Sequence, residues 1–203
     1  MDGYRLALRR EIMDETRTDK CSFVVPSYAL SEVEKILSDS EDEKAKITLG
    51  TKHIMFTMEN TVVISRRLEG EFLNYKNSIP KNSKYFIEAD RKSLISSIER
   101  VSLIISDKLK SPVRCVFGED ILRVYTSTSL GKASDECQTE GNGENLEIGF
   151  NNKYILDALK AAPAEKLRLQ LSTGVAPCIV VPADDKANFL YMILPVRLRA
   201  NEN

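Results

Sequence analysis

Side chains that could do catalytic chemistry are few in this sequence, and their spacing does not bring them together. His53 is the only histidine, and no nucleophile motif of the G-x-S-x-G type accompanies it. We expect His53 to be a solvent-facing residue of a strand. No Walker loop or G-x-G-x-x-G pattern occurs, and Gly141-Asn142-Gly143 is predicted to be a turn between strands. These patterns favour a protein that is not an enzyme.

The acidic and sulfur-bearing residues do not suggest a metal site or an acid–base pair. A carboxylate cluster follows a predicted helix at Asp39, Glu41, Asp42 and Glu43. Because no apolar residues surround this cluster to shift a pKa, we interpret it as a solvated linker. The cysteines are Cys21, Cys115, Cys137 and Cys178, without a C-x-x-C pair. We therefore predict no cofactor, no metal and reduced cysteines, with Cys115 and Cys178 as small core residues.

The charge balance limits the kinds of partner that the whole chain can attract. The 203 residues include 29 Lys and Arg against 30 Asp and Glu, and 42% of the residues are hydrophobic. The chain can bury a core, but its net charge does not attract nucleic acid, so DNA contact would require basic residues gathered on one face. No secretion signal or membrane-spanning stretch is recognisable, which predicts a cytoplasmic protein without membrane contact.

A single local pattern occurs three times: a short strand, a capping residue and an amphipathic helix. The helix starts lie within residues 25–30, 88–94 and 149–155, where Leu30, Leu94 and Ile155 hold the same place at spacings of 64 and 61 residues. This period suits a duplicated half-domain built from a helix and a sheet. Repeated units of this kind usually shape an extended surface.

Hydrophobic spacing predicts the elements of each repeat. Three helices have one apolar stripe each, formed by Leu30, Val33, Ile36 and Leu37, by Leu94, Ile98, Val101 and Ile105, and by Tyr154, Ile155, Ala158, Leu159 and Ala162. Alternation predicts strands at 46–49, 54–58, 61–65, 121–125 and 167–171, with turns at 59–60 and 118–120. The predicted fold class is α+β, with helices packed on one side of antiparallel sheets.

Four separated segments resemble the bacterial sliding clamp, the beta subunit of DNA polymerase III. They are Asp2-Gly3-Tyr4-Arg5-Leu6-Ala7-Leu8, residues 68–80, Glu147-Ile148-Gly149-Phe150-Asn151 and Leu194-Pro195-Val196-Arg197-Leu198. The resemblance implies the DNA-clamp fold of repeated half-domains. It places the C-terminal half of the clamp middle domain at 1–79 and the clamp C-terminal domain at 80–203. In the family a Thr usually stands where this chain has Met1.

The family is a non-catalytic processivity factor that encircles double-stranded DNA, without sequence preference, as a head-to-tail homodimer ring. Its helices line the hole. The basic residues that the resemblance suggests for DNA contact are Arg91, Lys92, Arg100, Lys153 and Lys160. A merely solvated helix face explains each lysine equally well. The basic pair that often opens the middle-domain helix is replaced here by Ser27-Tyr28.

The resemblance also implies a pocket that binds linear motifs of the polymerase III alpha subunit, the clamp loader and repair proteins. The matching positions are Gly3, Tyr4, Arg5, Leu6, Leu73, Leu109, Asn151, Tyr154, Val175, Pro177, Met192, Leu194, Pro195, Val196 and Arg197. Core packing is the alternative for Leu6 or Leu194 taken alone. Asn77 and Ser78 replace the basic and aliphatic residues common in the family, which predicts a somewhat different preferred motif.

The subunit contact of the family corresponds here to Leu103, Ile104 and residues 132–138, including Lys132, Asp135 and Glu136. Without the N-terminal domain we expect a monomer or an association that does not close a ring. Two functions therefore stay open. One is a fragment of a processivity clamp, and the other is a stand-alone truncated peptide-binding or decoy module that captures clamp partners without encircling DNA.

Overall fold

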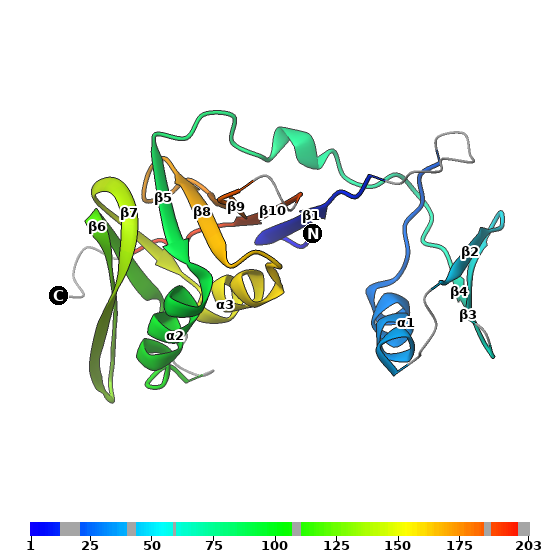
Figure 1. Cartoon of the computed structure of the whole chain (residues 1–203), viewed down its shortest axis with the longest axis horizontal. Coiled ribbons are helices and arrows are strands. Elements are labelled where there is room, and N and C mark those ends of the chain that lie inside the picture. Colours follow the sequence, from blue (N-terminus) through cyan, green and yellow to red (C-terminus); the bar gives the residue numbers. More distant parts are fainter. Residues whose placement is uncertain (13–20, 40–43, 59, 107–110, 185–187, 199–203) are drawn as a thin grey trace. The chain divides into compact units, whose positions relative to one another are not determined.

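The computed structural model describes residues 1–12, 21–39, 44–58, 60–106, 111–184 and 188–198. The chain divides into two compact units, which we describe separately (Figure 1). The large unit contains residues 1–12 and 75–203, and the small unit contains residues 13–74.

The large unit is built on a seven-stranded antiparallel sheet with the order β1-β10-β9-β8-β5-β7-β6. Its strands are β1 (Arg5–Arg9), β5 (Tyr85–Asp90), β6 (Val113–Thr128), β7 (Gly131–Phe150), β8 (Lys166–Leu171), β9 (Cys178–Pro182) and β10 (Phe189–Ile193). A short 3₁₀ turn, η1 (Tyr75–Asn77), precedes β5. The first and last strands of the chain thus pair at one end of this sheet.

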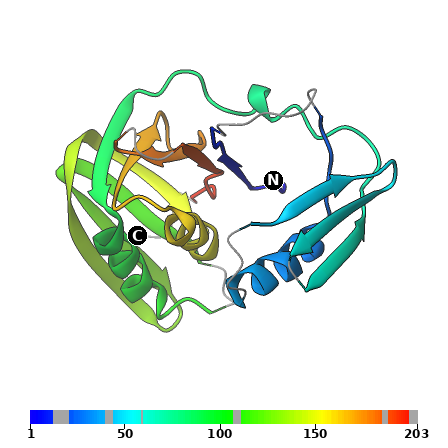
Figure 2. The same cartoon turned by 45° about the vertical axis from the view of Figure 1, so that its right-hand side comes forward.

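Two helices, α2 (Arg91–Ser102) and α3 (Asn152–Ala161), pack side by side against this sheet (Figure 2). Both begin within the predicted ranges, 88–94 and 149–155, at the capping residues Asp90 and Asn151. The carboxylate of Asp90 accepts a hydrogen bond from the backbone N–H of Ser93 at 2.7 Å, and this bond lowers the pKa of Asp90. The side chain of Asn151 accepts from the N–H groups of Lys153 and Tyr154. These bonds satisfy donors that a helix start otherwise leaves unpaired.

The core of the large unit lies between these helices and the sheet. The predicted stripes supply Leu94 and Ile98 from α2 and Ile155 from α3, and each of these residues is at most 1% exposed. Cys115 and Cys178 are fully buried, as predicted, and burial raises the pKa of Cys178 to about 12. These cysteines therefore behave as small apolar residues at neutral pH.

The hairpin of β6 and β7 differs from its prediction. The expected turns at 118–120 and 141–143 are wrong, because both segments lie inside long, continuous strands. The residues that suggested turns instead form irregularities of the ladder, where Asp120 has φ 52° and Gly141 has φ 115°. The N–H of Gly141 donates to Asp120 Oδ1 at 2.9 Å, which ties the two irregular segments together. Residues with positive φ serve bulges as well as chain reversals.

The small unit packs α1 (Ser27–Asp39) on a three-stranded antiparallel sheet. The strands are β2 (Lys46–Leu49), β3 (His53–Met58) and β4 (Thr61–Arg66). Pairing of Met58 with Thr61 confirms the predicted hairpin, although Glu59 lies outside the described residues. His53 is an exposed residue at the start of β3, as predicted. Residues 41–43 of the predicted acidic linker also lie outside the described residues.

The apolar stripe predicted for α1 is only partly buried. Val33 is 5% exposed, but Leu30 is 47% exposed and Leu37 is 38% exposed. The helix instead buries Ala29 beside Val33. The prediction that Leu30 repeats the core positions of α2 and α3 is therefore wrong for burial, because the apolar cluster around Val33 in this unit is small.

Candidate functional site

A cavity of about 530 Å³ opens in the large unit near the N-terminal ends of β1 and α3 and the C-terminal end of β10. Its lining residues come from four places that are distant in sequence. They are Tyr4, Ile105, Ser106, Asn151, Asn152, Lys153, Tyr154, Leu194, Pro195 and Val196. All of them belong to the large unit. Apolar and aromatic side chains thus share the cavity with a few amide, hydroxyl and ammonium groups.

Strand pairing brings the two chain-terminal segments of the cavity together. β1 pairs with β10 in antiparallel register, with Arg5 opposite Ile193. Beyond the strands, the N–H of Leu194 donates to the carbonyl oxygen of Tyr4 at 2.9 Å. The backbone at Tyr4 and Leu194 is therefore held by the same ladder that forms the end of the sheet.

The segment after β10 continues across the end of β7. The N–H of Val196 donates to the carbonyl oxygen of Gly149 at 2.8 Å. A Cβ atom at Gly149 would lie 2.5 Å from Leu198 Cδ2 and 2.9 Å from the oxygen of Val196. Only glycine permits this close approach without displacing residues 194–198. Sequence reasoning noted the segment around Gly149 but missed this role, because the contact is visible only in three dimensions.

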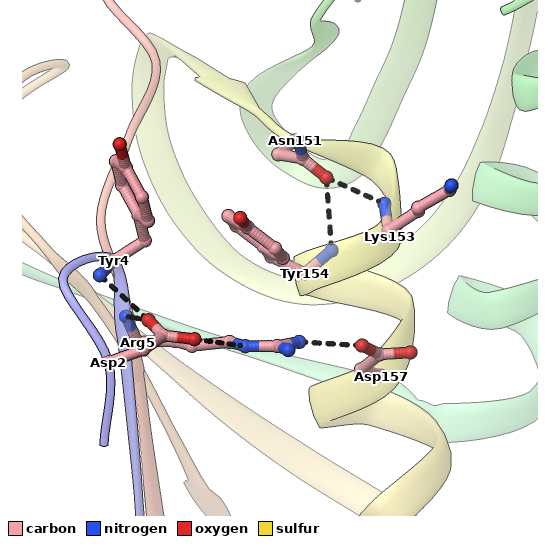
Figure 3. A network of polar contacts seen from close by, with 7 residues as sticks. All are labelled: Asp2, Tyr4, Arg5, Asn151, Lys153, Tyr154 and Asp157. Carbon is pink, nitrogen blue, oxygen red and sulfur yellow. Dashed lines mark hydrogen bonds and ion pairs between the residues drawn. The ribbon is translucent and has the colours of Figure 1, made fainter. Parts of the chain in front are cut away.

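Tyr154 is held from several directions (Figure 3). The cap formed by Asn151 fixes its backbone N–H. Its ring stacks on the ring of Tyr4, with centroids 5.8 Å apart and an interplanar angle of 28°. The guanidinium of Arg5 lies 4.5 Å from the same ring centroid, a distance typical of a cation–π contact.

Arg5 is also bound by two carboxylates. Its Nε donates to Asp2 Oδ2 at 3.1 Å, and its Nη1 donates to Asp157 Oδ2 at 2.6 Å. The bond to Asp157 is the main reason that the pKa of Arg5 is raised. The N–H of Tyr4 donates to Asp2 and lowers the pKa of that carboxyl. Both shifts favour the ionised forms of Arg5 and Asp2.

Six of the positions suggested for motif binding meet at the cavity: Tyr4, Asn151, Tyr154, Leu194, Pro195 and Val196. Leu6 and Met192 are buried and pack with Ile179, which agrees with the core alternative for Leu6. Gly3, Arg5, Val175, Pro177 and Arg197 belong to the large unit but are not lining residues. Leu73 is exposed in the small unit, and Leu109 lies outside the described residues.

Four lining residues were not proposed for the motif pocket: Ile105, Ser106, Asn152 and Lys153. Asn152 and Lys153 lie between the proposed positions Asn151 and Tyr154. Their place at the start of the predicted helix was therefore a signal that could have included them. Ile105 was predicted to belong to the apolar stripe of the second helix, but α2 ends at Ser102 and Ile105 lies in the segment that follows it. Hydrophobic spacing did not indicate that Ile105 and Ser106 reach the cavity.

The basic residues suggested for DNA contact lie on α2 and α3, and Arg100 and Lys160 are in ion pairs. Arg100 Nε is 2.5 Å from Asp135 Oδ2, and Lys160 Nζ is 2.6 Å from Glu99 Oε1. Arg91 begins α2 and is half-buried, whereas Lys92 and Lys153 are exposed. The positive charge that remains uncompensated on the two helices is therefore modest.

The residues suggested for subunit contact lie at the end of α2 and along β7. Leu103 is 84% exposed, Ile104 is half-buried, and Lys132 and Glu136 are exposed. Asp135 is the partner of Arg100. Within the described strands, residues 131–138 pair with β6 alone, since β5 meets β7 only at Thr139 and Glu140. This part of β7 has a free edge that could accept another strand.

Two negative findings apply to the part of the chain that the structure describes. No three His, Cys, Asp or Glu side chains converge there as metal ligands would. None of its helices has the length and apolar character needed to cross a bilayer.

Two family profiles match consecutive parts of the chain. Residues 1–74 match the profile of the DNA polymerase III beta subunit, central domain. Residues 76–197 match that of the DNA polymerase III beta subunit, C-terminal domain. These matches cover nearly the whole chain in the order expected from the resemblance.

Individual proteins agree with the profiles. The beta sliding clamps of Haemophilus influenzae and Halalkalibacterium halodurans are 30% and 32% identical to the chain. Each alignment covers 97% of this chain, and 53% or 52% of the relative. The chain thus spans about half the length of these curated relatives.

Solved structures show the same fold. The beta subunit clamp of Bartonella birtlesii aligns with a TM-score of 0.90 at 28% identity, over 97% of this chain and 56% of that chain. The beta subunit of Thermotoga maritima aligns with a TM-score of 0.85 at 28% identity, over 98% and 53%. The α+β clamp fold is therefore confirmed. The chain belongs to the DNA polymerase III beta subunit family, the bacterial sliding clamps, which are non-catalytic accessory subunits of the polymerase and contain the central and C-terminal domain sequences found here.

Proposed function

We propose that this chain is the motif-binding part of a cytoplasmic sliding clamp, a processivity factor that tethers the replicative polymerase to DNA. The single observation that carries the proposal is the cavity that Tyr4, Tyr154 and Leu194 line together. These residues come from segments that are far apart in the sequence and that match the family in order.

The chemistry of the cavity suits an extended peptide with apolar side chains. Leu194, Pro195 and Val196 supply apolar side chains to the lining, and the aromatic residue Tyr154 lines the same cavity. Asn151 and Ser106 add polar groups to the lining. Recognition sites of this type obtain affinity from apolar burial and orientation from a few polar contacts. The proposed ligands are linear motifs of the polymerase III alpha subunit, the clamp loader and repair proteins.

A synthetic peptide with a Gln followed by aliphatic and aromatic residues is expected to bind the purified chain with a Kd on the order of micromolar. That affinity corresponds to about 8 kcal/mol of net binding free energy, to which burial of apolar side chains and polar contacts of the peptide both have to contribute. Isothermal titration calorimetry measures it. A scrambled peptide of identical composition is the control. Equal heats from both peptides would contradict a specific motif site.

We place the domain division after residue 79, with the middle-domain part before it and the C-terminal domain after it. The break between the two family matches, at residues 74–76, supports a boundary in this region. β1 is exceptional, because it lies in the middle-domain segment and pairs with β10 of the large unit. This pairing explains how residues from both sides of the boundary reach one cavity.

We further propose that α2 and α3 face the DNA backbone when the chain is part of a complete ring. Contact with phosphates carries no sequence information and suits sliding. Lys92 and Lys153, which are exposed, and Arg91 at the start of α2 are the proposed phosphate contacts. Leu103 and the free edge of β7 are proposed for the subunit contact.

This chain by itself is expected to bind duplex DNA weakly and not to remain on it. With so few uncompensated basic residues on α2 and α3, affinity should fall steeply between about 50 and 200 mM salt. Light scattering gives the oligomeric state, and retention on a sealed DNA circle is compared with retention on the same circle after it is cut. A dimer that stays on the sealed circle at high salt and leaves the cut one would contradict this expectation.

A second function, capture of clamp partners without encircling DNA, is favoured by one observation. Every residue that lines the cavity belongs to the large unit, so peptide capture needs no second subunit. A primer-extension assay with a complete clamp distinguishes the two functions. A decoy reduces polymerase processivity when added in excess. A clamp component supports processivity when the domain that its relatives have in addition is supplied with it.

A further inference from the structure

We infer that Asp157 is a positioning residue for partner binding, which acts through Arg5 to hold the ring of Tyr154 as a fixed wall of the cavity. The inference rests on the proposed function, since it assigns a role at the same site. Asp157 does not line the cavity itself, and its side chain is 63% exposed. Its influence on a bound peptide must therefore pass through another side chain.

The position of Asp157 on α3 places it next to Tyr154. The two residues are three positions apart on one helix, so their side chains lie on the same face. Arg5 reaches this face from β1, which is 152 residues away in the sequence. Its guanidinium divides its donors, with Nε on Asp2 and Nη1 on Asp157. Arg5 thus spans from its own strand to the helix (Figure 3).

This bridge determines where the guanidinium sits relative to the aromatic ring. With both carboxylates bound, the carbon of the guanidinium lies 4.5 Å from the Tyr154 centroid, and Tyr4 stacks on the same ring. Without the Asp157 charge, Arg5 keeps only the neighbouring Asp2 and regains rotamer freedom. The Tyr154 ring then loses a cation–π contact and has to be ordered by the incoming peptide.

The charge balance of the network indicates that Arg5 holds Tyr154 in place and does not bind an acidic group of the partner. Its single positive charge faces two carboxylates, Asp2 and Asp157. A guanidinium that is already paired twice offers little to a third anion. Because exposed ion pairs contribute little to folding, loss of this bridge should affect the order of Tyr154 more than the stability of the fold.

The experiment compares Asp157→Asn with Glu99→Gln. The control breaks an equally short and similarly exposed ion pair that joins α2 to α3, Glu99 with Lys160 at 2.6 Å, and neither residue lines the cavity. Binding of the Gln-aliphatic-aromatic peptide is measured by calorimetry, and NMR follows the ring signals of Tyr4 and Tyr154. We expect Asp157→Asn to weaken binding about fivefold and to shift both ring signals, whereas Glu99→Gln changes neither.

Two further variants separate positioning from a general structural role. Asp157→Glu restores the charge and should recover part of the affinity. In an Arg5→Lys background, which lacks the planar fork, Asp157→Asn should cause little additional weakening, because residues that act as one unit are not additive.

The outcomes distinguish this inference from the proposed function. A wild-type chain that binds no peptide would overturn the proposed function and, with it, any role of Asp157 in binding. Wild-type binding that Asp157→Asn leaves unchanged, or additive losses in the double variant, would overturn the inference alone. A loss of thermal stability in Asp157→Asn clearly beyond that of Glu99→Gln, without recovery in Asp157→Glu, would show a structural role instead.

Discussion

Leu194→Asp is expected to raise the Kd of the motif peptide by more than about 100-fold. Leu194 is half-buried and lines the cavity beside Pro195 and Tyr154. Docking of an apolar peptide side chain there would remove water from the new carboxylate, and burial of a charge without a well-placed partner costs several kcal/mol. Calorimetry with the peptide that binds the wild-type chain measures the loss.

Leu194 can be substituted without loss of its backbone hydrogen bond, which allows a matched control variant. The hydrogen bond from Leu194 to Tyr4 uses the main-chain N–H, so any substitution except proline can retain it. Leu194→Met keeps the apolar volume and should bind within about threefold of the wild type. Circular dichroism checks that both variants are folded. A folded Leu194→Asp variant that binds as tightly as Leu194→Met would show that the peptide does not occupy this cavity.

Gly149→Ala is expected to weaken peptide binding by at least about tenfold and to lower the stability of the large unit by about 1–3 kcal/mol. The new methyl group would lie 2.5 Å from Leu198 and 2.9 Å from the carbonyl oxygen of Val196. Since neither distance is tolerable, the segment after β10 must move away from β7. This movement breaks the Val196–Gly149 hydrogen bond and displaces the apolar lining residues 194–196 of the cavity. Calorimetry and thermal unfolding measure the two effects.

Two variants test the cause of this loss. Gly50→Ala makes the same chemical change where the nearest atom, the oxygen of His53, is at an ordinary 3.4 Å, so it should leave binding unchanged. Leu198→Ala in the Gly149→Ala background removes one of the two clashes and should restore part of the affinity, while the clash with the carbonyl oxygen remains. If the Gly149→Ala variant bound the peptide with the same Kd as the wild-type chain, peptide binding would not depend on this close packing of the segment after β10.

Local sequence signals determined the helices and part of the strands. The caps at Asp90 and Asn151 and the buried faces of α2 and α3 follow from hydrogen bonds and spacings within a few residues. The same is true of the hairpin of β3 and β4 and of the α+β class. Family membership was recognisable because four short segments occur in the right order. None of these predictions needs contacts between distant parts of the chain.

Tertiary structure decided what the local pattern could not. The burial of Leu30 depends on how much sheet faces α1, and the bulges at Asp120 and Gly141 depend on the strand opposite. The cavity exists because β1 pairs with β10, and this register brings Arg5 to Asp157 across 152 residues. Gly149 is required only because Leu198 packs over it. Sequence by itself therefore determined the helices, the hairpin of β3 and β4 and the family, because their signals are short-range. Pairing between distant segments determined the continuous course of β6 and β7 and which side chains form the site.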